Sequence, residues 1–243
     1  MPVPVPPSGT PEKIITGIFR VFLALAVCLV PALLVLNQDV FLAASNYLQL
    51  AAAAIGAVVF CIAYFRSGRK KHFAWAAGAF GIWAAANAAW YVNVFLGLRA
   101  IVFPSLIDMG FLAFMFLLAS AFQVALPRTR VNPKISLGIL VLLLITPIAI
   151  FLAMGITAST LMTFLYFFFA AALIIIGLSH SLREHPFLFS GTLLYCIAFM
   201  VYPLREVLFP GIAWLNIIGP VVIASFSLTV IGFFREPAEK ASG

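Results

Sequence analysis

The chain has 243 residues, of which 65% are hydrophobic and 9% are charged. A soluble domain is about half apolar and about one quarter charged, so this composition excludes an ordinary soluble fold and predicts a membrane protein. A membrane-spanning helix needs about 20 apolar residues, so the length holds seven or eight helices with no room for an attached kinase, cyclase or nucleotide-binding domain.

Long apolar segments follow one another along almost the whole chain. Residues 161–177, for example, lack the apolar–polar alternation of a transmembrane β-strand. The segment lengths suit helices that cross about 30 Å of hydrocarbon. We therefore expect an all-α polytopic membrane bundle with about eight transmembrane helices, at residues 14–36, 41–65, 73–97, 104–126, 135–154, 159–178, 187–204 and 212–234.

Basic residues concentrate on one side of the predicted membrane. With the N-terminus inside, twelve of the fourteen Lys and Arg residues fall inside, and only Arg99 and Arg205 fall outside. An excess of Lys and Arg marks cytoplasmic loops, so we expect a multi-pass protein of the cell membrane with both termini in the cytoplasm. A Pro-rich tail over residues 1–13 and a second tail over residues 235–243 would both be cytoplasmic. The net charge of +7 then indicates topology and attraction to anionic membrane lipids rather than nucleic-acid binding.

One short segment occurs twice. Residues 98–106 (LRAIVFPSL) recur as residues 204–212 (LREVLFPGI), and both join two predicted helices on the outer side. Each half has an even number of spans, so the duplication predicts two parallel four-helix pseudo-repeats, at residues 14–126 and 135–234, related by an axis along the membrane normal. The alternative is chance similarity between apolar sequences.

Polar side chains concentrate in the outer half of the predicted helices, whereas the inner half holds little beyond Gln123 and Tyr195. Placing polar groups inside a bilayer costs free energy, so their concentration at one depth indicates a functional site. The alternative is structural, since Trp and Tyr form interfacial belts and amides join helices by hydrogen bonds. We predict an outer cavity whose candidate ligand-binding residues are Asn46, Gln49, Asn87, Trp90, Tyr91, Arg99, Asp108, Tyr202, Arg205 and Glu206.

Asp108 has two interpretations. Ser105 and Asp108 have the spacing of a capping box at the beginning of a helix, where an acid also suits the positive end of the helix dipole. In the second interpretation, Asp108 pairs with Arg99 or Arg205 and lines the cavity.

Motifs of enzyme chemistry are absent from the sequence. It contains no HExxH, no Gly-x-Ser-x-Gly and no phosphate loop. All three histidines, His72, His180 and His185, lie at the inner boundary of the membrane, so no two of them could ligate a haem between helices. No predicted transmembrane helix has a central Lys that could form a retinal Schiff base. We therefore expect a non-enzymatic protein without a metal or another cofactor.

The stretch from Trp83 to Leu112 resembles the multi-pass N-terminal membrane sensory module of bacterial and archaeal diguanylate cyclases and sensor histidine kinases. In that module an aromatic-rich third helix precedes a Pro-Phe-Pro-Ser-x-x-Asp-x-x-Tyr-Leu motif, which opens the fourth helix. The residues that match this motif are Phe103, Pro104, Ser105, Asp108 and Leu112, while Val102 and Phe111 replace its first Pro and its Tyr. The resemblance implies a sensory input module whose aromatic and Asp108 positions face the outer side. Such modules continue into a catalytic domain, which this sequence lacks, so we expect the output to come from a separate signalling protein.

These patterns favour a receptor or sensor that binds a small or amphipathic ligand in the outer-half cavity. The alternative is a small transporter or channel built from the tandem repeat. Transport usually needs polar groups along a path through both halves of the membrane, and the apolar inner half therefore favours the receptor. Small residues every fourth position from Ala77 to Ala89 predict close packing of the helix at 73–97 against that at 41–65, with an oligomer interface as the alternative.

Overall fold

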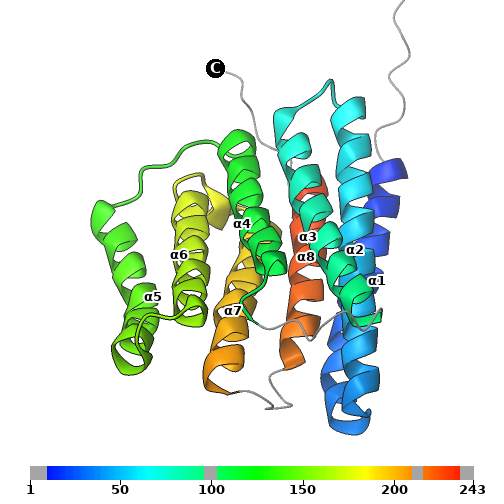
Figure 1. The fold of residues 1–243 in the computed structure, drawn as a ribbon. Coiled ribbons are helices and arrows are strands. Elements are labelled where there is room, and N and C mark those ends of the chain that lie inside the picture. The colour runs from blue at the N-terminus through cyan, green and yellow to red at the C-terminus, as the bar shows by residue number, and fades with distance from the viewer. Residues whose placement is uncertain (1–9, 96–102, 210–215, 236–243) are drawn as a thin grey trace, which may run out of the picture.

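The structure is a computed structural model that describes residues 10–95, 103–209 and 216–235. Within these residues the chain forms eight α-helices, with 3₁₀ turns at Leu182–Glu184 and at residues 216–217, and no strand (Figure 1). The helices are α1 (Thr10–Val35), α2 (Gln38–Arg66), α3 (Lys71–Phe95), α4 (Leu106–Ala125), α5 (Pro133–Met154), α6 (Ala158–Leu178), α7 (Pro186–Leu208) and α8 (Ile218–Arg235). The predicted all-α polytopic bundle is confirmed.

Seven of the described helices are long and apolar enough to cross a membrane, and α3 is the eighth helix. The 25 residues of α3 include Lys71, His72, Asn87 and Asn93 as well as aromatic residues of intermediate polarity, which lower its mean hydropathy. The same helix packs against α2 on one side and α4 on the other. It lies alongside them in the bundle (Figure 1), and Asn87 among its polar side chains is buried there.

Local sequence signals set the helix boundaries. Asn37 precedes α2, and its side-chain oxygen accepts a hydrogen bond from the Asp39 N–H at 2.8 Å. Before α6, the Thr157 N–H donates to Thr160 Oγ1 at 2.8 Å, and the Thr160 N–H donates to Thr157 Oγ1 at 3.2 Å. These bonds satisfy N–H groups that have no partner within the helix. The expected boundaries, which came from the apolar segments alone, lie within four residues of those observed, except that α8 begins at Ile218 instead of residue 212.

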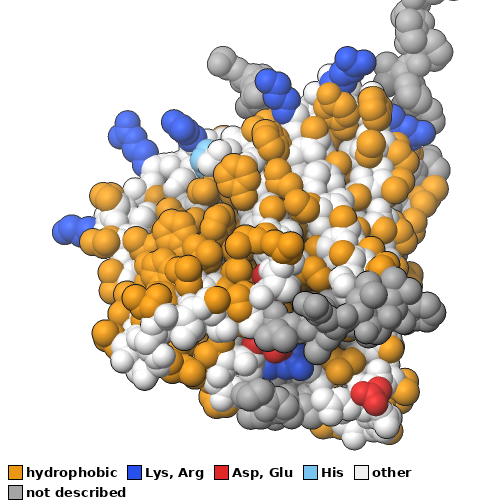
Figure 2. Space-filling view, in the orientation of Figure 1, with side chains coloured by type: hydrophobic (Ala, Val, Ile, Leu, Met, Phe, Trp, Pro, Cys, Tyr) orange, Lys and Arg blue, Asp and Glu red, His pale blue; other side chains and the backbone are white. Residues whose placement is uncertain are grey.

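The helices form a bundle in which α3 lies between α2 and α4, and α7 lies between α6 and α8. The packing of α1 and α2 against α8 and of α4 against α6 joins the first four helices to the last four, while α5 packs chiefly against α6 at one edge (Figure 1). Helix α1 begins, and α8 ends, at the same end of the bundle. Every described Lys or Arg other than Arg20, which lies within α1, and Arg205 is in or beside a helix end here, and Figure 2 shows several of these basic side chains; we call this end of the bundle the basic end.

An aromatic layer fills the middle of the bundle. It consists of Phe80, Trp83, Phe114, Tyr195 and Phe226, all at most 2% exposed. The ring centroids of Phe80 and Phe226 are 5.1 Å apart, and those of Phe114 and Tyr195 are 4.6 Å apart. Tilted and edge-to-face contacts of this kind add to the gain from apolar packing. The aromatic layer therefore packs α3, α4, α7 and α8 against one another.

Two glycines bring the backbones of α7 and α8 into close contact. A Cβ atom at Gly191 would lie 2.6 Å from Thr229 Oγ1 and 2.9 Å from the Ser225 carbonyl oxygen. A Cβ atom at Gly232 would lie 2.8 Å from the Leu188 backbone nitrogen. Since small residues at helix crossings permit such contacts in membranes, this pair fixes the distance between the two helices.

Replacement of Gly191 by Ala should therefore destabilise the bundle. The added methyl group meets backbone atoms of α8 that cannot move independently, and such overpacking costs about 1–3 kcal/mol. Thermal unfolding of the detergent-purified protein measures the effect. The matched control is Gly138→Ala in α5, where a Cβ atom would have no neighbour within 4 Å. Equal melting temperatures for the two variants would contradict the close approach of α7 and α8.

Candidate functional site

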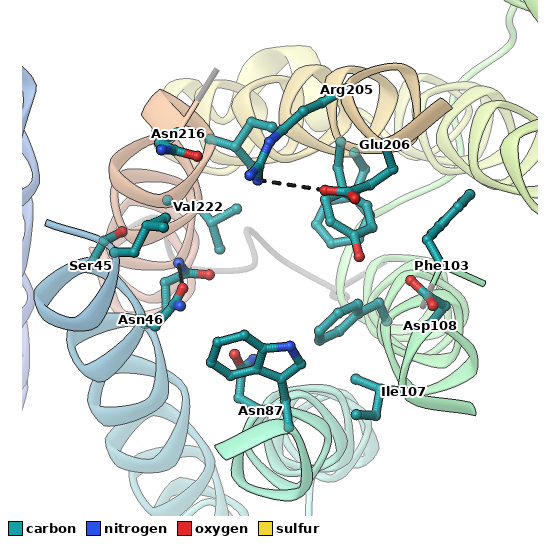
Figure 3. Close-up of a pocket in the computed structure, with 18 of the residues that line it drawn as sticks. Ser45, Asn46, Asn87, Phe103, Ile107, Asp108, Arg205, Glu206, Asn216 and Val222 are labelled. Carbon is teal, nitrogen blue, oxygen red and sulfur yellow. Dashed lines mark hydrogen bonds and ion pairs between the residues drawn. The ribbon is translucent and has the colours of Figure 1, made fainter. Parts of the chain in front are cut away.

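A cavity of about 310 Å³ lies among α2, α3, α4, α7 and α8, toward the end opposite the basic end. We call it the polar pocket. Figure 3 shows labelled side chains from all five helices, or from the residues just before them, around the cavity. The lining residues are Leu42, Ser45, Asn46, Gln49, Trp83, Asn87, Trp90, Phe103, Ser105, Ile107, Asp108, Phe111, Phe199, Tyr202, Arg205, Glu206, Asn216, Ile218, Gly219 and Val222.

The structure brings most of the predicted site residues together in this pocket. Those that line it are Asn46, Gln49, Asn87, Trp90, Asp108, Tyr202, Arg205 and Glu206. They come from α2, α3, α4 and α7, which lie far apart in the sequence. Arg99 lies outside the described residues. Tyr91 is not among the residues that line this pocket.

Tyr91 instead packs on the flank of α2. Its ring stacks on that of Tyr47, with centroids 4.7 Å apart, and its hydroxyl lies 3.5 Å from the Ala43 carbonyl oxygen. Consecutive residues of an α-helix point about 100° apart, so Trp90 can line the pocket while Tyr91 turns away from it. The clustering of polar and aromatic residues in the sequence did not distinguish these two directions.

Asp108 lies in the wall of the pocket and is only 2% exposed. Its Oδ2 accepts hydrogen bonds from the Ser105 N–H at 2.6 Å and from Ser105 Oγ at 2.9 Å, as expected for a helix cap. Its Oδ1 accepts a hydrogen bond from the Tyr166 hydroxyl at 2.8 Å. Asp108 therefore caps the beginning of α4, contacts α6 through Tyr166 and lines the cavity.

The expected ion pair between Asp108 and Arg205 does not form. The Arg205 guanidinium instead lies 3.6 Å from the carboxylate of Glu206, its neighbour in the chain (Figure 3). Both side chains are partly exposed, at 24% and 32%, so this pair is solvated and contributes little to stability. Asp108 has its carboxylate held by the Tyr166 hydroxyl and by Ser105, which leaves Arg205 to pair near the rim.

Three further side chains present unpartnered polar atoms at the pocket. Ser45, Trp83 and Asn216 are at most 3% exposed. Ser45 Oγ, Trp83 Nε1 and both polar atoms of the Asn216 amide are buried without a hydrogen-bond partner among the described residues. A buried polar group without a partner costs about 1–3 kcal/mol, so these atoms make the wall of the pocket less stable than a fully hydrogen-bonded one.

Sequence reasoning did not include these three residues among the candidates. Ser45 precedes Gln49 by four residues, and Trp83 precedes Asn87 by four, so each shares a helix face with a predicted site residue. That spacing is the signal that would have found Ser45 and Trp83, but it does not apply to Asn216. The pocket also includes Phe199 of α7, whose apolar side chain gives no comparable signal.

The arrangement is suited to recognition of a polar molecule. Amides and hydroxyls in the wall supply both donors and acceptors, and six aromatic residues supply apolar surface. Within the described ranges no group of three His, Cys, Asp or Glu side chains is placed to hold a metal ion.

The hydrogen bond between Tyr166 and Asp108 should stabilise the bundle. In Tyr166→Phe the Asp108 Oδ1 loses a buried donor, which costs about 1–3 kcal/mol. Thermal unfolding in detergent measures the loss. The matched control is Tyr47→Phe, since Tyr47 is 61% exposed and its hydroxyl makes no hydrogen bond within the described part of the chain. A Tyr166→Phe variant as stable as this control would show that the bond does not hold α4 against α6.

Comparisons with known proteins identify no relative. No protein-family model matches the chain, and neither a curated protein nor a solved structure matches it. The resemblance to membrane sensory modules stays a prediction from the residues between Trp83 and Leu112.

Proposed function

We propose that this membrane protein is a receptor that binds a small polar or amphipathic molecule in the polar pocket. The observation that carries the proposal is the set of buried, unpartnered polar atoms of Ser45, Trp83 and Asn216 in the pocket wall. A fold that leaves several such groups without partners is less stable than one that satisfies them. A bound molecule would supply the missing hydrogen bonds and thereby recover this free energy.

The pocket limits the chemistry of the ligand. Trp83 Nε1 can only donate a hydrogen bond, whereas the Asn216 amide can both donate and accept, so the ligand needs acceptors as well as a donor. The aromatic rings of Trp90, Phe111 and Phe199 favour an apolar part in the same molecule. A volume of about 310 Å³ suits a small molecule rather than a peptide or a lipid chain.

The charge distribution supports a ligand that enters from outside the cell. The described Lys and Arg residues other than Arg20 and Arg205 lie toward the basic end, and the polar pocket lies toward the opposite end. Cytoplasmic loops carry the excess of Lys and Arg, so the basic end would be cytoplasmic and the pocket would face the exterior. Both ends of the chain would then be cytoplasmic.

The aromatic layer favours binding over transport. Trp83 borders the pocket, and behind it the rings of Phe114 and Phe226 lie 5.4 Å and 5.0 Å from the Trp83 ring. These side chains are almost fully buried, so the layer would block a polar solute. The resemblance to sensory input modules supports the same role, with a separate signalling protein receiving the signal. Ligand binding would act by favouring one of two helix arrangements.

The polar pocket should be accessible to water from outside the cell. In a cysteine-free background made by C28A, C61A and C196A, we expect Gln49→Cys to react with a membrane-impermeant methanethiosulfonate reagent added to intact cells. Gln49 lines the pocket, whereas the control residue Val27 lies on α1 and is 63% exposed on the surface of the bundle. Val27→Cys would therefore face lipid at a similar depth.

The reacting species is the thiolate, which forms far less readily in hydrocarbon than in water. We therefore expect Gln49→Cys to react at least about tenfold faster than Val27→Cys. Mass spectrometry of the purified protein measures the extent of labelling. Equal rates for the two variants, or labelling of Gln49→Cys only after the cells are broken, would contradict an exterior pocket.

A receptor with a closed aromatic layer should conduct no solute. We expect proteoliposomes that contain the wild-type protein to show the same permeability to glycine, glucose and choline as protein-free liposomes. Stopped-flow light scattering under an osmotic gradient of each solute measures this permeability. Protein-dependent flux that Asp108→Asn abolishes would instead support the transporter.

A further inference from the structure

A second cavity, of about 600 Å³, lies at the basic end of the bundle. We call it the basic pocket. Its walls come from the first turns of α1 and α3 and from the last turns of α2, α4 and α8, together with the beginning of α7. No residue of this cavity lines the polar pocket, so the two sites are separate.

Positive charge dominates the rim of the basic pocket. Arg66 at the end of α2, Lys70 just before α3 and Arg235 at the end of α8 line it, and Glu12 is the single carboxylate among the lining residues. No ion pair engages the three basic side chains within the described ranges, although the Arg235 guanidinium carbon lies 6.0 Å from the centre of the Phe187 ring. Three cations facing one carboxylate favour an anion with one or two negative charges.

Apolar side chains also line the basic pocket. Ile15 of α1, Val59 and Ile62 of α2, and Phe73 of α3 line the cavity together with Phe234 of α8. The rings of Phe73 and Phe234 stack with centroids 5.8 Å apart, which gives this wall a continuous apolar surface. A soluble phosphate would gain nothing from such a surface. A molecule with an anionic group and an apolar part would use both.

The cavity also lies at a seam that faces the membrane. It is bordered by the first turns of α1 and the last two turns of α2, and α1 packs more extensively against α8 than against α2. Ile62 in this seam is 46% exposed at the surface of the bundle, where hydrocarbon would surround it. A phospholipid acyl chain can therefore lie along the seam while the phosphate remains at the end of the helices.

We propose that the basic pocket binds the headgroup of an anionic phospholipid, with Arg66, Lys70 and Arg235 on the phosphate and the α1–α2 seam against the acyl chains. Basic pockets between transmembrane helices are suited to such headgroups, because the surrounding hydrocarbon strengthens the attraction of charges at its boundary. The proposal is independent of the polar pocket, and failure of either site leaves the other unaffected.

Native mass spectrometry of the full-length protein, released from detergent, tests this site. The probes are phosphatidylglycerol and phosphatidylcholine with identical acyl chains. We expect wild-type protein to bind phosphatidylglycerol more tightly. We also expect the combined substitutions Arg66→Gln, Lys70→Gln and Arg235→Gln to weaken that binding at least about tenfold, since each basic residue contributes separately.

The matched control combines Arg128→Gln, Arg130→Gln and Lys134→Gln. It removes the same charge from the same end of the bundle, at exposed residues that do not line the basic pocket. Its affinity for phosphatidylglycerol should stay within about twofold of wild type, as expected for solvated surface charges. Equal loss in both triple variants would indicate only general attraction to the surface and would overturn the site.

A second variant tests the seam while retaining every charge. Ile62→Trp places a large side chain between α1 and α2 at an exposed position, where it should not prevent folding. We expect it also to lower the affinity for phosphatidylglycerol. Unchanged binding in Ile62→Trp, or displacement of phosphatidylglycerol by millimolar glycerol 1-phosphate, would overturn a lipid site in this seam.

Discussion

Inside a bilayer, a buried carboxylate must obtain its hydrogen bonds from the protein, because hydrocarbon offers none. Asp108, which is 2% exposed, obtains them from Ser105 and from the Tyr166 hydroxyl. These bonds begin α4 and hold it against α6, and the contact of α4 with α6 helps to join the first four helices to the last four. The wall of the polar pocket therefore depends on the same group that stabilises the fold around it.

Much of the fold could be predicted because its determinants are local. The length of the apolar segments predicted the helices, and the spacing of Ser105 and Asp108 predicted the beginning of α4. The hydrogen-bond partner of Asp108 on α6 could not be predicted from local spacing. Tyr166 lies 58 residues further along the chain, and only the packing of α4 against α6 brings its hydroxyl to the carboxylate.

The direction of each side chain explains the remaining differences in the site. Trp90 and Tyr91 are adjacent in sequence, yet one lines the pocket and the other stacks on Tyr47. Arg205 and Asp108 both line the pocket, yet Arg205 pairs with Glu206, while Asp108 is held by Ser105 and Tyr166. Composition and depth predict where polar residues gather, but helix rotation and competition between partners decide which of them meet.

The helix contacts can be compared with those expected for two parallel repeats, and the repeat itself stays a prediction. In two parallel halves α2 corresponds to α6 and α4 to α8, and the contact of α2 with α8 matches that of α6 with α4. The first helix of each half departs from this pattern, since α1 packs mainly against α8 whereas α5 packs chiefly against α6. The basic pocket depends on this difference between the halves, because Glu12 and Ile15 of α1 form part of its wall beside α8. The polar pocket includes no residue of α1 or α5, and the two cavities share walls from α2, α3, α4, α7 and α8, so a lipid in one and a ligand in the other would contact the same five helices.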